Sequence, residues 1–152
     1  MSVESSYLTD THCHLDFASF DQDRALVIER ARAAGLKRIL NPGIDIETSK
    51  AALRLAEAYS EVYAAVGVHP NSASSWMPGT IRDLEELGSI SKVVAIGEIG
   101  LDYYRLGAPI EVQRRVLRAQ LELAGNLGYP VIIHCRDAFA DILEILSDWI
   151  GE

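Results

Sequence analysis

Two histidines near the start of the chain have the spacing of a metal-binding pair. In the segment "DTHCHLD", only Cys13 separates His12 from His14. Residues two apart in a strand face the same side, so both imidazoles would point together while Cys13 packs between sheet and helices. Two neutral imidazoles can then chelate one divalent ion, and a flanking carboxylate, Asp10 or Asp16, can orient a ring through its second nitrogen. Taken alone, the pair fits better with two histidines satisfied by hydrogen bonds.

Two further residues of the same chemistry follow other apolar runs. Glu98 comes directly after such a run in "AIGEIGLDYY", where a metal ion or an arginine, Arg105 or Arg136, would offset the cost of burying a carboxylate. His134 ends the run in "PVIIHC", and a core histidine is the alternative there. Three imidazoles and one carboxylate from three strands fit a metal centre better than four unrelated side chains. We therefore predict these metal ligands: His12, His14, Glu98 and His134.

Three more side chains are candidates for contact with a substrate. His69 in "GVHPN" is a further ligand, a proton donor or a phosphate contact, or else a strand-end histidine held by the turn at Pro70. Asp102, in the loop after Glu98, would hold a substrate or support the ligands. Arg136 offers a planar fork to pairs of phosphate oxygens, and the alternative is an ion pair with a nearby aspartate. We predict His69, Asp102 and Arg136 as substrate-binding residues.

The elements that must position these residues alternate between strand and helix. Five short apolar runs are each followed by helical periodicity, which is typical of βα units. The predicted strands are residues 7–11, 38–40, 62–68, 93–97 and 131–133. The predicted helices begin near Asp21, near Asp45, before Ile81, at Pro109 and before Ile142. All four histidines of the chain lie just past strand ends, where parallel α/β folds assemble their sites. This placement favours a barrel over a doubly wound sheet.

Composition limits the classes of protein to consider. The 152 residues, 49% hydrophobic and 24% charged, predict one globular domain, residues 1–152. A net charge of −8 repels a polyanion, so any nucleic-acid binding must be local and assisted by cations. Cys13 and Cys135 form no C-x-x-C pair, and no secretory leader opens the chain, so we expect free thiols and a cytoplasmic location. No apolar run approaches the roughly 18 residues of a membrane-spanning helix, so we expect no membrane partner.

Four segments together resemble one family, the TatD-like metal-dependent deoxyribonucleases of the metallo-dependent hydrolase superfamily. They are "DTHCHLDF", "GVHPN", "AIGEIGLDYYR" and "EVQRRVLRAQLELAGNLGYPVIIHCRDA", in the family's order and separations. The resemblance implies a TIM (β/α)8 barrel, of which this chain holds about five βα units. It also implies that the four predicted ligands occupy metal-ligand positions, with Glu98 bridging two ions and acting in catalysis. The segment around His69 resembles a substrate-facing loop, although Asn71 stands where many members have a second histidine.

The same resemblance implies hydrolysis of phosphodiester bonds in DNA with two divalent ions, Mg²⁺, Mn²⁺ or Zn²⁺. The superfamily also hydrolyses amides, lactones and phosphotriesters, which keeps another ester or amide substrate as an alternative. Family members supply a further histidine and an aspartate after the fifth unit, and this chain ends at Glu152 before either. We therefore expect the N-terminal portion of a barrel, with weak metal binding and little activity alone. A complementing C-terminal half or self-association would then complete it.

Overall fold

The computed structural model describes residues 7–151, in which strands alternate with helices. Neighbouring strands are parallel and form a single sheet in the order β1-β2-β3-β4-β5. The strands are β1 (Leu8–Asp10), β2 (Leu36–Pro42), β3 (Val62–Val66), β4 (Val93–Asp102) and β5 (Val131–Arg136). The helices are α1 (Arg24–Ala33), α2 (Ile46–Ala58), α3 (Thr80–Gly88), α4 (Ile110–Leu127) and α5 (Phe139–Ile150), with 3-10 helices η1 (Ala18–Phe20) and η2 (Pro70–Ser75).

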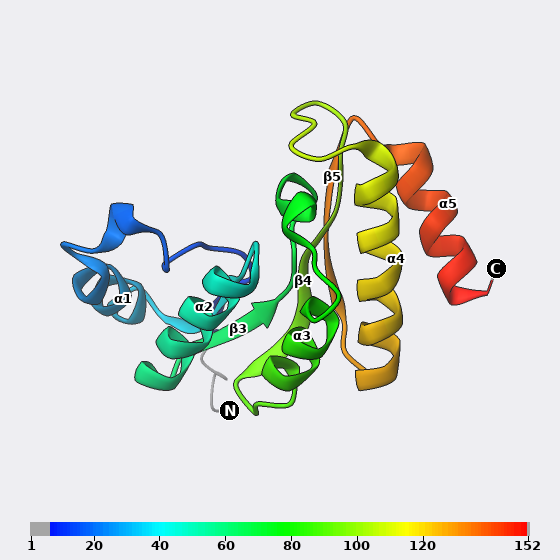
Figure 1. Cartoon of the computed structure of the whole chain (residues 1–152). Helices are drawn as coiled ribbons and strands as arrows, with labels where there is room; N and C mark the ends of the chain where they lie inside the picture. The colour runs from blue at the N-terminus through cyan, green and yellow to red at the C-terminus, as the bar shows by residue number, and fades with distance from the viewer. Residues whose placement is uncertain (1–6, 152) are drawn as a thin grey trace, which may run out of the picture.

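The strand order identifies the architecture. A doubly wound sheet reverses direction at a switch point, whereas here each strand lies beside the next in the sequence. Right-handed crossovers between consecutive parallel strands place all the connecting helices on one face of the sheet. Figure 1 shows the helices side by side in chain order, from α1 at the left to α5 at the right. The fold is therefore a curled α/β half-barrel, as predicted, with β1 and β5 at its two edges.

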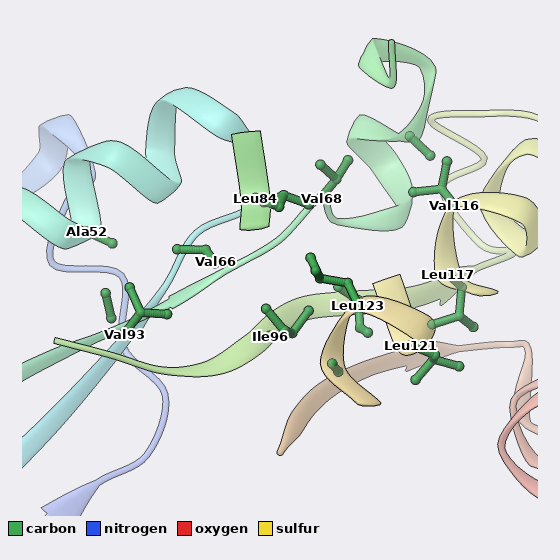
Figure 2. Close-up of a cluster of buried hydrophobic side chains, with 14 of the residues drawn as sticks. Ala52, Val66, Val68, Leu84, Val93, Ile96, Val116, Leu117, Leu121 and Leu123 are labelled. Carbon is green, nitrogen blue, oxygen red and sulfur yellow. The ribbon is translucent and has the colours of Figure 1, made fainter. Parts of the chain in front are cut away.

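The apolar core lies between this helical layer and the central strands. Figure 2 shows Ala52 of α2, Leu84 of α3 and Leu117 of α4 among the side chains that pack there with Val66 and Ile96. Strand β3 is buried along almost its whole length, as expected for a parallel strand covered on both faces. Within residues 7–151, no helix is both long enough and apolar enough to cross a membrane.

The first helix begins three residues later than predicted, at Arg24, and Asp21 is not its N-cap. The Arg24 guanidinium explains the difference, because it donates to the carbonyl of Leu15 at 2.6 Å and to the Asp21 carboxylate at 2.7 Å. Asp21 is thus engaged in an ion pair. The predicted start at Asp45 is confirmed by a reciprocal capping box, in which Asp45 and Thr48 each bind the backbone N–H of the other.

Strand β4 is longer than predicted and places the candidate site differently. The prediction ended this strand at Gly97, with Glu98 directly after it and Asp102 in the loop that follows, but the strand continues to Asp102. The glycines serve close packing instead of a turn. A Cβ on Gly97 would lie 2.6 Å from the Ile132 side chain, and one on Gly100 would lie 1.9 Å from the His134 carbonyl oxygen. Glycine lets β5 approach β4 within the sheet.

Candidate metal centre

Glu98 lies at the centre of a cluster of four histidines, and its two carboxylate oxygens face different members. Oε2 lies 3.3 Å from His12 Nε2 and 3.7 Å from His14 Nε2. On the other side, Oε1 lies 3.0 Å from His134 Nδ1 and 4.0 Å from His69 Nε2. The structure therefore brings the four predicted ligands together and adds His69 to them. A carboxylate with its oxygens directed to separate groups is suited to bridging two ions.

The alternative that an arginine offsets the Glu98 charge does not match the structure. In the described part of the chain, the ion-pair partners of this carboxylate are histidines, and neither Arg105 nor Arg136 is among them. Burial by itself raises the pKa of Glu98, but the hydrogen bond from His134 and the nearby His14 imidazole lower it overall. The same interactions with Glu98 raise the pKa of both imidazoles. Glu98 is therefore held as an anion whose charge the neighbouring imidazoles offset, and a divalent cation can take over that role.

Two of the three distances among His12, His14 and Glu98 fit a shared ion, and the third, 3.7 Å from His14 Nε2 to Glu98 Oε2, is slightly longer. The Nε2 atoms of the two histidines are 3.3 Å apart, and both face the same oxygen of Glu98. Ligand atoms bound at about 2.0–2.1 Å to one ion lie about 2.9–3.4 Å from each other. His12 and His14 lie just after β1, past the strand end as predicted, and their rings converge there. Cys13 between them packs against the core, as expected.

His69 approaches Glu98 in a tautomer that favours donation. Its Nδ1 accepts the backbone N–H of Asn71 at 3.1 Å, so this nitrogen carries no proton. In the neutral ring the proton is then on Nε2, the atom that faces Glu98. Burial and the charge of His134 lower the pKa of His69 to about 4, which keeps the ring neutral near pH 7. His69 lies within reach of the centre, and its Nε2–H is arranged to donate a hydrogen bond.

Asp102 and Arg136 occupy different surroundings from each other. Asp102 is only 1% exposed, and both of its carboxylate oxygens accept hydrogen bonds inside the protein, so the predicted contact with a substrate does not fit its burial. Arg136 is exposed on β5, and its guanidinium lies 3.9 Å from the centre of the Tyr104 ring. Among residues 7–151, the alternative ion pair of Arg136 with an aspartate is not formed: Asp141 lies 3.4 Å from Arg114 instead.

The register of β4 and β5 aligns the site residues. Gly100 pairs with His134 and Asp102 pairs with Arg136, so His134 and Asp102 lie two rungs apart on neighbouring strands. The backbone N–H of Glu98 donates to the carbonyl of Gly43 at 2.9 Å, which fixes Glu98 against the segment that follows β2. The site therefore depends on residues from separate βα units.

Three polar residues that support this edge were missed by the sequence interpretation. Gln120 of α4 binds both the N–H and the C=O of Val68, and Gln113 does the same for Asp102. Asn71, which was noted only for the histidine that it replaces, donates to the Asp102 carboxylate at 3.0 Å. Both glutamines are fully buried. Their position on the apolar face of a predicted helix was the available signal, because a buried amide needs partners.

Fold and site together define an α/β-barrel protein with a histidine-rich candidate metal centre at the carboxyl ends of its strands. The chain belongs to the TatD related DNase family, whose model matches residues 9–152.

The chain is 42% identical to the uncharacterized metal-dependent hydrolase YabD of Bacillus subtilis, over 93% of this chain and 55% of the relative. It is 39% identical to the 3'-5' ssDNA/RNA exonuclease TatD of Salmonella typhimurium, over 93% of this chain and 54% of the relative. Among solved structures, the TatD homologue YJJV of Escherichia coli K12 matches with a TM-score of 0.86 at 35% identity, over 93% of this chain and 56% of that one. A TatD family hydrolase of Entamoeba histolytica matches with a TM-score of 0.84 at 26% identity, over 96% and 55%. The chain thus spans about half the length of the relatives it matches.

Proposed function

We propose that the protein is part of a metal-dependent hydrolase that cleaves phosphodiester bonds of single-stranded DNA. The observation that carries this proposal is the Glu98 carboxylate, whose two oxygens face separate groups of histidines. Relatives of the same family carry the name 3'-5' ssDNA/RNA exonuclease, which supports a nucleic acid as substrate. The net charge of −8 makes cations at this centre the natural means of holding a phosphate.

Each residue of the cluster has a role in this proposal. His12, His14 and His134 offer nitrogen ligands and Glu98 offers a bridging carboxylate, a donor set that suits two divalent ions such as Mn²⁺ or Zn²⁺ and also admits Mg²⁺. Bound ions supply Lewis-acid activation of water and of the phosphodiester. His69 donates its Nε2–H to a phosphate oxygen. The exposed Arg136 guanidinium attracts the phosphate backbone beside the centre.

The test is cleavage of single-stranded DNA by the protein in its complete assembly. We expect cleavage that requires Mg²⁺, Mn²⁺ or Zn²⁺, stops with EDTA and is lost in Glu98→Gln. An exposed control, Glu57→Gln on α2, should cleave as well as the wild type. A panel of amides, lactones and phosphotriesters in parallel covers the other substrates. Turnover of one of these without cleavage of DNA would assign the centre to a different ester or amide and reject the nuclease proposal.

We also propose that further βα units complete the barrel, either from the same polypeptide or from a partner. Helix α5 is apolar on two sides: Ile142 and Ile145 are buried, while Phe139, Leu143 and Ile150 are exposed. The open face of the sheet also carries a concavity of about 380 Å³, lined by residues of β1 to β4 that include Ile39 and Leu40. A neighbouring helix and strand beside β5 would cover the exposed side of α5, and the remaining strands of a closed barrel would enclose the concavity. We expect weak metal binding and little activity until they do.

A further inference from the structure

We propose that two aspartate–asparagine pairs, Asp102–Asn71 and Asp16–Asn41, are positioning groups that direct His134 and His14 toward opposite flanks of the Glu98 carboxylate. This inference rests on the proposed metal centre and extends it to the residues behind the ligands. Each pair joins a buried or nearly buried carboxylate to an amide from a neighbouring βα unit. Each carboxylate faces the ring nitrogen that its histidine directs away from Glu98.

The two carboxylate oxygens of Asp102 contact different groups. Oδ1 accepts the backbone N–H groups of Tyr104 and Arg105, at 3.1 and 2.8 Å, and so fixes the loop that follows β4. Oδ2 accepts from Asn71 Nδ2 at 3.0 Å and lies 3.2 Å from His134 Nε2. Asn71 is itself held, because its Oδ1 accepts the backbone N–H of Gly107. The oxygen that faces His134 is therefore fixed from a second element.

This contact determines which nitrogen of His134 is free to act as a ligand. A carboxylate cannot donate, so the proton between Asp102 Oδ2 and His134 Nε2 belongs to the imidazole. Once His134 gives up the proton that its Nδ1 shares with Glu98 Oε1 at 3.0 Å, the free lone pair is therefore on Nδ1. A carboxylate behind a ligating histidine fixes its tautomer and raises its basicity. Asp102 thus leaves the Nδ1 lone pair of His134 to bind an ion on the Oε1 side of Glu98.

Asp16 and Asn41 repeat the arrangement on the other flank. Asn41 is fully buried; its Nδ2 donates to Asp16 Oδ1 at 2.7 Å and its Oδ1 accepts the Asp16 backbone N–H at 3.2 Å. Asp16 Oδ1 lies 4.0 Å from His14 Nδ1, which is buried without a hydrogen-bond partner within the described residues. A ring that gives its Nε2 lone pair to an ion carries its proton on Nδ1. Asp16 is the carboxylate placed to accept a hydrogen bond from this His14 Nδ1–H.

The substitution Asp102→Asn separates the two roles of this side chain, which are to anchor the loop after β4 and to accept a hydrogen bond from His134. The amide keeps one carbonyl oxygen for Tyr104 and Arg105, so the loop retains its anchors. It presents an NH₂ group, however, where His134 and Asn71 both need an acceptor. We expect a folded protein in which His134 loses its orientation toward Glu98.

The measurement follows the ring ¹⁵N shifts of the four histidines during titration of the chain with Zn²⁺. In D102N, the Zn²⁺ concentration needed to shift His134 should rise about 10–100-fold, while His12 and His14 respond as in the wild type. In Asp16→Asn the pattern should reverse, with His14 affected and His134 unchanged. The exposed substitution Glu57→Gln removes the same charge far from the cluster and should change neither response.

A double variant distinguishes positioning from structural support. Adding Asn71→Asp to D102N turns the donor at position 71 into an acceptor and so restores a hydrogen bond between positions 71 and 102. We expect thermal stability to recover in D102N/N71D while the weakened Zn²⁺ response of His134 persists, because an NH₂ group still faces the ring. Recovery of the His134 response in this double variant would overturn the proposal.

Two other results would also contradict the proposal: a wild-type His134 that does not respond to Zn²⁺, or a D102N protein that responds like the wild type. Failure of the nuclease proposal looks different. There, the residue-specific Zn²⁺ responses would appear as expected, but the complete assembly would leave single-stranded DNA uncut.

Discussion

At the scale of single residues, the candidate site depends on one carboxylate that several imidazoles share. The side chain of Glu98 is only 12% exposed, and its charge is balanced by His134 on one oxygen and by His12 and His14 on the other. The residue types of this cluster could be predicted from the sequence. Burying histidines and a glutamate after apolar runs costs free energy unless they bind one another or a shared ion. The residues that hold this cluster in place could not be predicted. In the sequence, nothing distinguishes Asn71 from other loop asparagines, because its partner Asp102 is brought near only by the fold.

The close approach of β4 and β5 gives a first residue-scale prediction. Gly100 has a φ of 149°, and a Cβ there would lie 1.9 Å from the His134 carbonyl oxygen. We expect Gly100→Ala to lower the free energy of unfolding by about 3 kcal/mol or more, because backbone atoms must move apart. Urea unfolding measures the loss. The control Gly125→Ala within α4, where the nearest atom to the added Cβ lies at an ordinary 3.6 Å, should leave stability unchanged or slightly higher. Equal effects of the two substitutions would contradict this packing argument.

At the scale of elements, α4 does more than cover the sheet. Its Gln113 side chain binds the N–H and C=O of Asp102 and the carbonyl of Ala108, so the helix holds both ends of the loop after β4. The start of α4 near Pro109 and its helical periodicity could be predicted, but these amides could not be assigned partners. Their partners lie on strand ends whose positions depend on the whole sheet.

We expect Gln113→Leu to destabilise the protein by about 2 kcal/mol or more, because it leaves buried backbone groups of Asp102 and Ala108 unsatisfied. Hydrogen exchange adds a local measurement: the Asp102 amide, which donates to Gln113 Oε1 at 2.8 Å, should exchange faster in the variant. Unchanged protection of this amide would show that the helix does not hold the loop.

A second contact between elements gives a pH dependence. The Tyr103 hydroxyl donates to Asp141 of α5 at 2.5 Å. Burial, together with the hydrogen bond to Asp141, raises the pKa of Tyr103 from 10.0 to about 12. Because the folded state favours the neutral phenol, this contribution to stability is complete below pH 10 and disappears as pH rises toward about 12.

The measurement is the free energy of unfolding across that interval. Tyr103→Phe should flatten part of the alkaline decline, and phenolate absorbance should show one tyrosine fewer with a late titration. The exposed Tyr104, changed to Phe, serves as the control and should keep the decline of the wild type. If the two variants titrate alike, the contact between the loop and α5 does not carry the effect.

At the scale of the whole molecule, the half-barrel leaves edges that none of residues 7–151 covers. Phe139 on α5 is 69% exposed, and β5 is an edge strand of the sheet. The sequence predicted this arrangement from five βα units, while the capping and packing details required the structure. We expect the isolated chain to associate with itself or with the units that complete the barrel. Sedimentation of the wild type should show this self-association, and the double substitution Phe139→Ser/Leu143→Ser should weaken it. A monodisperse monomer at high concentration would contradict self-association.

The measurement that tests the central claim most directly is the metal content of the purified chain beside that of Glu98→Gln. Both proteins are dialysed against Zn²⁺ or Mn²⁺, and bound metal is counted while circular dichroism confirms that each is folded. We expect the wild type to bind divalent ions and to release them to EDTA. We expect the variant to lose affinity for these ions by more than the roughly 10–100-fold that is typical of residues behind the ligands. Equal metal binding by the two folded proteins would contradict a centre built around Glu98.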